Sequence, residues 1–162
     1  MKIVCLADTH LKKFNGFPQI LESQLTSADL IIHAGDWQTI DVYKALCSYG
    51  NVEGVYGNVD GDEIKKLVPE KKIIKIEGKR IGIVHGDGIG KTTEKRALES
   101  FMEGEVDLII FGHSHIPYSR FSKRSLLFNP GSPTAKRKLP YYSFGIITIK
   151  NDQIETKHIY FS

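Results

Sequence analysis

Short runs of consecutive apolar residues recur along this chain, and most of them end at a glycine or a polar residue. Runs that are continuous rather than alternating are typical of strands covered on both faces. Two of these runs, residues 3–7 and 30–32, flank residues 19–27, where apolar positions recur at near-helical spacing. Pro18 precedes that segment and suits an early helical position. The pattern therefore predicts a strand, a helix and a second strand at the start of the chain.

The same reading predicts further helices and strands. Helices are expected at residues 40–49, with Thr39 as N-cap and Gly50 at the end, and at residues 91–102. Apolar runs predict strands at residues 52–56, 73–76, 81–85, 106–111, 118–121, 126–128, 142–149 and 154–161. A turn at Gly78 joins the second and third of these into a hairpin. Two packed sheets with helices outside, in a single domain over residues 1–162, are the architecture that we predict.

Length and composition agree with a globular domain. A chain of 162 residues can bury about two thirds of its unfolded surface, and 41% hydrophobic with 25% charged residues excludes disordered and collagen-like classes. No apolar stretch approaches the roughly 20 residues of a membrane helix, and the start is too short and too soon charged for a signal peptide. We therefore expect a cytoplasmic protein, in which Cys5 and Cys47 are small buried residues rather than a disulfide.

The charge balance says little about partners. A formal net charge of +3 is modest, and the basic clusters at residues 71–72, 123–124 and 136–138 are typical of a solvated surface. Nucleic-acid binders usually carry a stronger and more concentrated basic footprint. A nucleic-acid partner is therefore not expected, whereas a small phosphate-bearing substrate is compatible with this charge.

Possible metal ligands follow five of the apolar runs. They are Asp8 and His10, Asp36, Asn58, His85, and His113 with His115. Each alone has an ordinary explanation, since Asp near a strand end commonly caps a turn and a Gly-Asn pair tolerates left-handed backbone. In an extended segment, side chains two residues apart project to the same side. Because ligands bind at the carboxyl ends of strands in open α/β sheets, the whole set predicts a metal site. The two oxygens of Asp36 make it the candidate bridge between two cations.

The order of these clusters, Asp-x-His, Gly-Asp, Gly-Asn-x-Asp, His-Gly and Gly-His-x-His, resembles the calcineurin-like metallophosphoesterases. The resemblance is closest to small bacterial and archaeal phosphodiesterases, covers residues 3 to 137 and includes the Asn129-Pro130-Gly131-Ser132 segment. It implies the metallophosphatase fold, an α/β four-layer αββα sandwich of two mixed sheets flanked by helices. It also implies two divalent metal ions, with manganese expected and nickel, zinc or iron as alternatives.

The resemblance further assigns the ligands to two overlapping sets. The first metal takes Asp8, His10, Asp36 and His115, and the second takes Asp36, Asn58, His85 and His113. Two cations roughly 3.5 to 4 Å apart lower the pKa of a bridging water, so that hydroxide attacks phosphorus in line. Asp36, Asn58 and His85 are then catalytic through the metals. Asn58 and Arg137 are candidate substrate contacts, and Asn129 and Ser132 either orient a phosphate or border the cleft.

Two positions depart from the family pattern. Val59 stands where larger relatives have a histidine that helps the leaving group depart, a contribution of roughly 10² to 10⁴ in rate. Asp87 stands where members commonly have a second histidine, and its charge would repel a dianionic monoester more than a monoanionic diester. Asp87 could instead hydrogen-bond a ligand histidine or contact a metal. We therefore expect hydrolysis of a small phosphate diester.

Two other functions are compatible with the same clusters. A protein-sorting subunit with this fold has dispensed with much of the metal chemistry and binds partner proteins, so a noncatalytic scaffold is the first alternative. A nuclease is the second, although no stacked aromatic platform or separate nucleic-acid module is evident. Exposed strands also make a homodimer conceivable.

Overall fold

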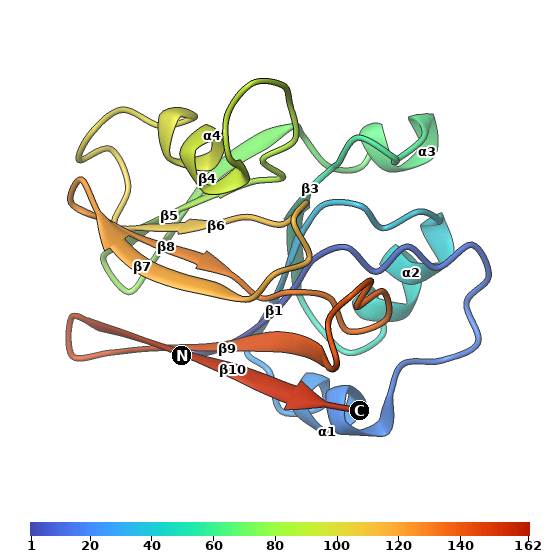
Figure 1. The fold of residues 1–162 in the computed structure, drawn as a ribbon. Coiled ribbons are helices and arrows are strands. Elements are labelled where there is room, and N and C mark those ends of the chain that lie inside the picture. The colour runs from blue at the N-terminus through green and yellow to red at the C-terminus, as the bar shows by residue number, and fades with distance from the viewer.

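The computed structural model describes residues 1–162 and contains two five-stranded mixed sheets (Figure 1). The strand order of the first sheet is β10 (Gln153–Phe161), β9 (Tyr142–Lys150), β1 (Lys2–Leu6), β2 (Leu30–Ala34) and β3 (Val52–Val55). The order of the second sheet is β4 (Lys71–Ile76), β5 (Lys79–Val84), β6 (Leu108–Ile110), β8 (Ser125–Asn129) and β7 (Tyr118–Ser122). All ten strands lie at or within two residues of the predicted apolar runs.

Each sheet contains three adjacent parallel strands, which lie at one side of the first sheet and in the centre of the second. Strands β1, β2 and β3 are parallel in the first sheet, and β5, β6 and β8 are parallel in the second. Strands β9 and β10, and likewise β4 and β7, pair antiparallel with their neighbours. Because parallel strands end at the same edge of a sheet, the loops after these parallel strands lie together in space.

The core between the sheets draws on both halves of the chain. Its 14 buried hydrophobic residues include Ile3 and Cys5 from β1 and Ile83, Ile110 and Phe128 from the second sheet. The neighbouring β1 residues face the other way and pack against helices. This alternation follows from the pleat of a strand. Both faces of β1 are therefore covered, which explains its unbroken apolar run.

Helices cover the outer faces of the two sheets (Figure 1). Helices α1 (Gln19–Leu25) and α2 (Ile40–Cys47) pack on the first sheet, and α4 (Thr93–Glu99) packs on the second. The predicted αββα sandwich is confirmed. No helix is long and apolar enough to cross a membrane.

Several local expectations need correction. The helix predicted over residues 91–102 is shorter at both ends, and α3 (Asp62–Lys65) lies in a charged stretch for which no helix was predicted. Thr39 is the N-cap of α2, but its hydroxyl donates to the Leu11 carbonyl 3.1 Å away instead of capping the helix. Both cysteines are free, as expected, yet Cys47 is exposed because it lies on the outward face at the end of α2.

Candidate metal centre

The seven predicted ligand residues converge at one edge of the sandwich. Each lies in a loop at the carboxyl end of β1, β2, β3, β5 or β6. Six of them form two groups in which the possible ligand atoms lie within 4.8 Å of one another: Asp8, His10 and His115 make the first group, and Asp36, His85 and His113 make the second group. Asn58 joins the second group, since its Oδ1 lies 3.1 Å from Nδ1 of His113.

Asp36 lies between the two groups. Its Oδ2 is 3.3 Å from Nε2 of His10 and 3.2 Å from Nε2 of His85. Its other oxygen accepts the Val59 N–H at 3.1 Å. One carboxylate oxygen therefore faces a histidine of each group, which is the arrangement that a bridging ligand requires.

Two buried polar atoms at the centre lack any hydrogen-bond partner: Oδ2 of Asp8 and Nε2 of His85. Leaving such atoms unpaired costs about 1 to 3 kcal/mol each, and more when the group is charged. Carboxylate oxygens and imidazole nitrogens are ligands for divalent transition metals. The side chains present therefore fit two divalent cations, which would satisfy both atoms.

The protonation preferences of the two groups differ. Burial raises the pKa of Asp8 to about 7, and burial lowers the pKa of His115 to about 4. Burial disfavours the charged form of His85 too, but the negative charges of Asp36, whose Oδ2 lies 3.2 Å from Nε2 of His85, and of Asp8 outweigh it and raise its pKa to about 9. A histidine must be neutral to bind a metal, so metal binding to the second group has to displace a proton from His85.

Left-handed backbone accounts for the convergence of these side chains. Five ligand residues have positive φ: Asp8 (55°), His10 (47°), Asp36 (59°), His113 (68°) and His115 (60°). The expectation that extended segments bring together residues two apart was wrong. The ordinary explanation for Asn58, a left-handed Gly-Asn turn, does not apply, because Asn58 has no positive φ. Such conformations cost on the order of 1 to 3 kcal/mol each and persist where the surroundings hold them in place.

Close packing of the loops depends on glycine at two positions. A Cβ at Gly57 would lie 2.1 Å from Oδ1 of Asp36, and one at Gly35 would lie 2.6 Å from Nδ1 of His85. Neither side chain could hold its place beside a larger residue. The Gly-Asp and Gly-Asn motifs therefore have a steric reason beyond turn formation.

Asn129 and Ser132 support the loops rather than a phosphate. Both are buried. The Asn129 amide donates to the Gly112 carbonyl at 2.9 Å, and the Ser132 hydroxyl donates to the Asp8 carbonyl at 2.7 Å. The option that they orient a phosphate is not supported, because their polar atoms are already engaged inside the protein.

Asp60 is a residue to which the sequence analysis gave no role. Its buried carboxylate accepts the N–H groups of Asp36 (2.9 Å), Gln38 (2.9 Å) and Gly57 (2.8 Å). It therefore ties the loop after β2 to the loop after β3 and fixes Asp36 relative to Asn58. The sequence feature that could have identified Asp60 is its position in the Gly-Asn-x-Asp cluster, because a carboxylate close to turn N–H groups is a common hydrogen-bond acceptor.

An exposed cation lies beside the first group. Arg137 is exposed, and its positive charge opposes the rise that burial causes in the pKa of Asp8, so its guanidinium lies near the first group.

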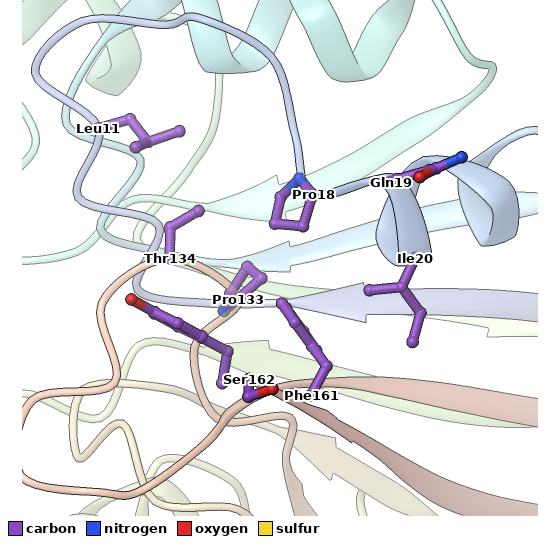
Figure 2. Close-up of a pocket in the computed structure, with 9 residues that line it drawn as sticks. Leu11, Pro18, Gln19, Ile20, Pro133, Thr134, Phe161 and Ser162 are labelled. Carbon is purple, nitrogen blue, oxygen red and sulfur yellow. The ribbon is translucent and has the colours of Figure 1, made fainter.

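A separate cavity of about 650 Å³ lies between Leu11, Pro18, Ile20, Pro133 and Phe161 (Figure 2). None of the seven ligand residues lines this cavity. The candidate metal ligands therefore lie at the strand edge and not in this cavity.

Comparisons with known proteins agree with this geometry. The calcineurin-like phosphoesterase superfamily domain matches residues 1–152. A probable metallophosphoesterase of Methanocaldococcus jannaschii is 33% identical over 162 residues, which cover 98% of this chain and 81% of the relative. A probable metallophosphoesterase of Methanothermobacter thermautotrophicus is 32% identical over 165 residues, with 98% and 92% covered.

Solved structures share the fold along almost their whole lengths. A single mutant of Vps29 from Entamoeba histolytica has a TM-score of 0.79 at 21% identity, with 100% of both chains covered. A Thermotoga maritima protein solved by NMR has a TM-score of 0.76 at 26% identity, with 99% of both chains covered. A structure described as a novel archaeal phosphodiesterase has a TM-score of 0.71 at 21% identity, covering 98% of this chain and 100% of that one. With the family match over residues 1–152, this chain belongs to the calcineurin-like phosphoesterase superfamily.

Proposed function

We propose that this protein is a phosphodiesterase that uses two divalent metal ions, and that its seven predicted ligands hold them. The supporting observation is the position of Asp36, whose Oδ2 lies 3.3 Å from a histidine of the first group and 3.2 Å from a histidine of the second. The first ion would be held by the first group with Asp36, and the second by the second group with Asn58.

The bound ions would activate a water molecule and neutralise charge on the phosphoryl group. Around them, the side chains of this chain set the conditions of the reaction. Asp36, with His85 and Asn58, would hold the second ion, and Asp36 would also bind the first. Asn58 is exposed and so can also reach the substrate, and Arg137 supplies a positive charge on the side of the first group. An exposed guanidinium suits a phosphate oxygen.

Two exposed residues favour a diester over a monoester. Val59 cannot give a proton to the leaving group, so esters of acidic alcohols are the expected substrates. Asp87 is close enough to His113 for its charge to act on the pKa of that imidazole. A negative charge there disfavours a dianionic monoester more than a monoanionic diester.

The direct test is hydrolysis of bis(p-nitrophenyl) phosphate and of p-nitrophenyl phosphate with manganese, nickel, zinc and magnesium. The two compounds share a leaving group and differ in charge. We expect faster diester turnover, with manganese as the preferred ion. Equal or faster turnover of the monoester at saturating manganese would reject the proposed preference.

A noncatalytic scaffold is the second candidate function. The feature that favours it is the presence of exposed apolar side chains directly after two ligand residues, namely Val59 after Asn58 and Ile116 after His115. Apolar surface of this kind is typical of protein-binding faces. A protein that binds the metals yet hydrolyses neither ester with any of the four ions would support the scaffold. A nuclease is the less favoured alternative, and cleavage of single-stranded nucleic acid with salt-sensitive binding would support it.

A further inference from the structure

Two of the six histidines in this chain, His33 and His158, are not among the predicted metal ligands. His33 lies in β2 and is fully buried. Its ring stacks on the indole of Trp37, with the ring centroids 3.8 Å apart and the planes 19° from parallel. Buried polar groups are almost always hydrogen-bonded. Both ring nitrogens of His33 therefore need partners inside the protein.

Both nitrogens of His33 find partners in loops that carry ligand residues. Nδ1 accepts the Gly35 N–H at 3.2 Å. Because an accepting ring nitrogen carries no proton, the ring is neutral and its one hydrogen is on Nε2. Burial, which holds the pKa of His33 well below its ordinary value, favours the same neutral form. Nε2 lies 3.3 Å from Oγ1 of Thr9, so this nitrogen donates to the hydroxyl.

The Thr9 hydroxyl extends this chain of hydrogen bonds to the loop after β2. Thr9 is fully buried and lies between the two ligands of the first group that follow β1. Since its oxygen accepts from His33, its own hydrogen can donate to the Trp37 carbonyl at 3.2 Å or to the Asp36 carbonyl at 3.3 Å. The same Asp36 carbonyl accepts the His10 N–H at 3.1 Å. The loop after β1 is therefore bonded to the backbone of the shared ligand.

Both ends of this chain of hydrogen bonds are fixed by other contacts. Trp37 is fully buried, and its indole N–H donates to the Val55 carbonyl in β3 at 2.8 Å. On the other side, the Thr134 hydroxyl donates to the Thr9 carbonyl at 2.6 Å. Removing the bonds between His33, Thr9 and Trp37 would therefore free the loop after β1 without loosening its surroundings.

His158 provides a contrast within the same molecule. Its ring stacks on Phe128, with the centroids 4.5 Å apart, and its Nε2 donates to the Asn129 carbonyl at 2.7 Å. It therefore joins β10 of the first sheet to β8 of the second. His33 instead joins the loop after β1 to the loop after β2, both of which carry ligand residues.

We propose that His33 and Thr9 are positioning residues, which hold the loop after β1 against Asp36 and thereby set the metal affinity of the first group. The inference rests on the proposed two-metal function and adds two residues that act through the ligands. Asp8 and His10 would shift relative to Asp36 if the hydrogen bonds were lost. Asp36 itself would stay in place, because Asp60 accepts its N–H from the other side. The effect therefore falls on the first ion.

The first test compares Thr9→Val with Thr9→Ser by calorimetric titration of manganese. Valine has the shape of threonine without its hydroxyl, whereas serine keeps the hydroxyl. Asp8 is fully buried, so the first group is expected to hold the tighter ion. We expect Thr9→Val to lower the affinity for the tighter ion about 10- to 100-fold and Thr9→Ser to keep it within about twofold, because only valine removes the group that orients the ligands. The weaker ion should be unaffected in both.

The second test compares His33→Gln with His33→Asn, which both lose the stacking on Trp37. The glutamine amide nitrogen can replace Nε2 and donate to Thr9, whereas the shorter asparagine can only replace Nδ1 as the acceptor. We expect the tighter ion to bind about tenfold more strongly to His33→Gln than to His33→Asn. His158→Asn is the control for loss of a stacked histidine. It should lower only the melting temperature in chelator and keep both affinities.

Three results would overturn the positioning role. They are a loss of affinity for both ions or for the weaker ion in Thr9→Val, equal affinities of Thr9→Val and Thr9→Ser, and equal affinities of His33→Gln and His33→Asn. If Thr9→Val does not fold, the two His33 variants decide. A wild-type protein that binds no manganese or hydrolyses no bis(p-nitrophenyl) phosphate would instead reject the proposed function. Two bound ions with intact hydrolysis and unaffected variants would reject only the role of His33 and Thr9.

Discussion

The first group and the second group contain the same types of side chain, yet they lie in different surroundings. In the first group Asp8 is fully buried, and its carbonyl accepts a hydrogen bond from Ser132. Each group has one partly exposed histidine, His10 or His113, but the second group also adjoins Asn58, which is exposed. The position of the second group also depends on Asp60, which joins two loops. The difference suggests a tighter metal site in the first group and a more open site in the second.

The largest effect is expected from removing the side chain that the groups share. Asp36→Ala should lower diester turnover on the order of 10³-fold, because neither ion keeps its bridging ligand and their electrostatic contribution is lost. Metal content measured by mass spectrometry should fall from two ions to one or fewer per chain. The exposed Asp41→Ala variant is the control and should keep both ions. Full activity of Asp36→Ala with every metal would eliminate the bridging arrangement.

The second expected effect is selective for the second group. Asp60→Asn removes the charged acceptor of three N–H groups, so the loops carrying Asp36 and Asn58 lose their mutual position. Substitution of residues that orient ligands typically lowers metal affinity by about 10- to 100-fold. Calorimetry should show this loss for the weaker of the two ions only, and high manganese should restore activity. The exposed Asp62→Asn variant is the control and should bind metal as the wild type does. An equal loss of affinity for both ions in Asp60→Asn would contradict a selective role of Asp60 at the second group.

The pH dependence of metal affinity sharpens the comparison. His85 must be neutral to bind, and its pKa is raised to about 9, so affinity at the second group should increase up to about that pH. Asp8, with a pKa raised to about 7, makes affinity at the first group level off above neutral pH. Calorimetric titrations from about pH 6.5 to about pH 8.5 check this. Over the upper half of that range the metal affinity of the weaker site, which we expect to be the second group, should keep rising, whereas the affinity of the first group should stay level.

The metal-free protein should respond to pH in the opposite direction. A raised His85 pKa contributes stability below its ordinary value of 6.5, and that stability is lost as the pH rises through about 9. Ionisation of buried Asp8 also opposes folding as the pH rises through about 7. The melting temperature in chelator should therefore fall over this window while stabilisation by manganese grows. A metal-induced increase in melting temperature that stays constant with pH would contradict the raised pKa values of His85 and Asp8.

The smallest effect is expected at the open side of the second group. Asp87→Asn should raise the ratio of monoester to diester turnover by a factor of about two to five, because one exposed charge is largely screened by solvent. Asp87→Glu keeps the charge and should keep the ratio. A ratio unchanged in Asp87→Asn would mean that this carboxylate has no part in substrate choice.

The regular part of the fold was predictable because its physical signal is local. An unbroken apolar run such as that of β1 reports a strand covered on both faces, and the two core clusters on either side of β1 confirm the reason. The resemblance to a family supplied the layer order. Helix α3 was missed because four residues in a charged stretch carry too little periodicity. Cytoplasmic location, a homodimer and manganese as the native ion stay predictions.

The candidate site was predictable in its membership but not in its geometry. The seven ligand residues could be identified because few residue types bind metals and these residues follow predicted strands. Left-handed backbone at five of these residues could not be predicted, because tertiary contacts impose it against local preference. The role of Asp60 was equally out of reach, since it depends on which N–H groups the folded loops bring to its carboxylate.

The most direct test of the central claim is electron paramagnetic resonance of the protein loaded with manganese, together with its metal content. Two ions that share the Asp36 carboxylate are magnetically coupled. We predict two manganese ions per chain and the spectrum of a coupled pair, which Asp36→Ala should convert to that of isolated ions or abolish. One ion per chain, or two with the uncoupled spectrum in the wild-type protein, would contradict a shared ligand and with it the two-metal site.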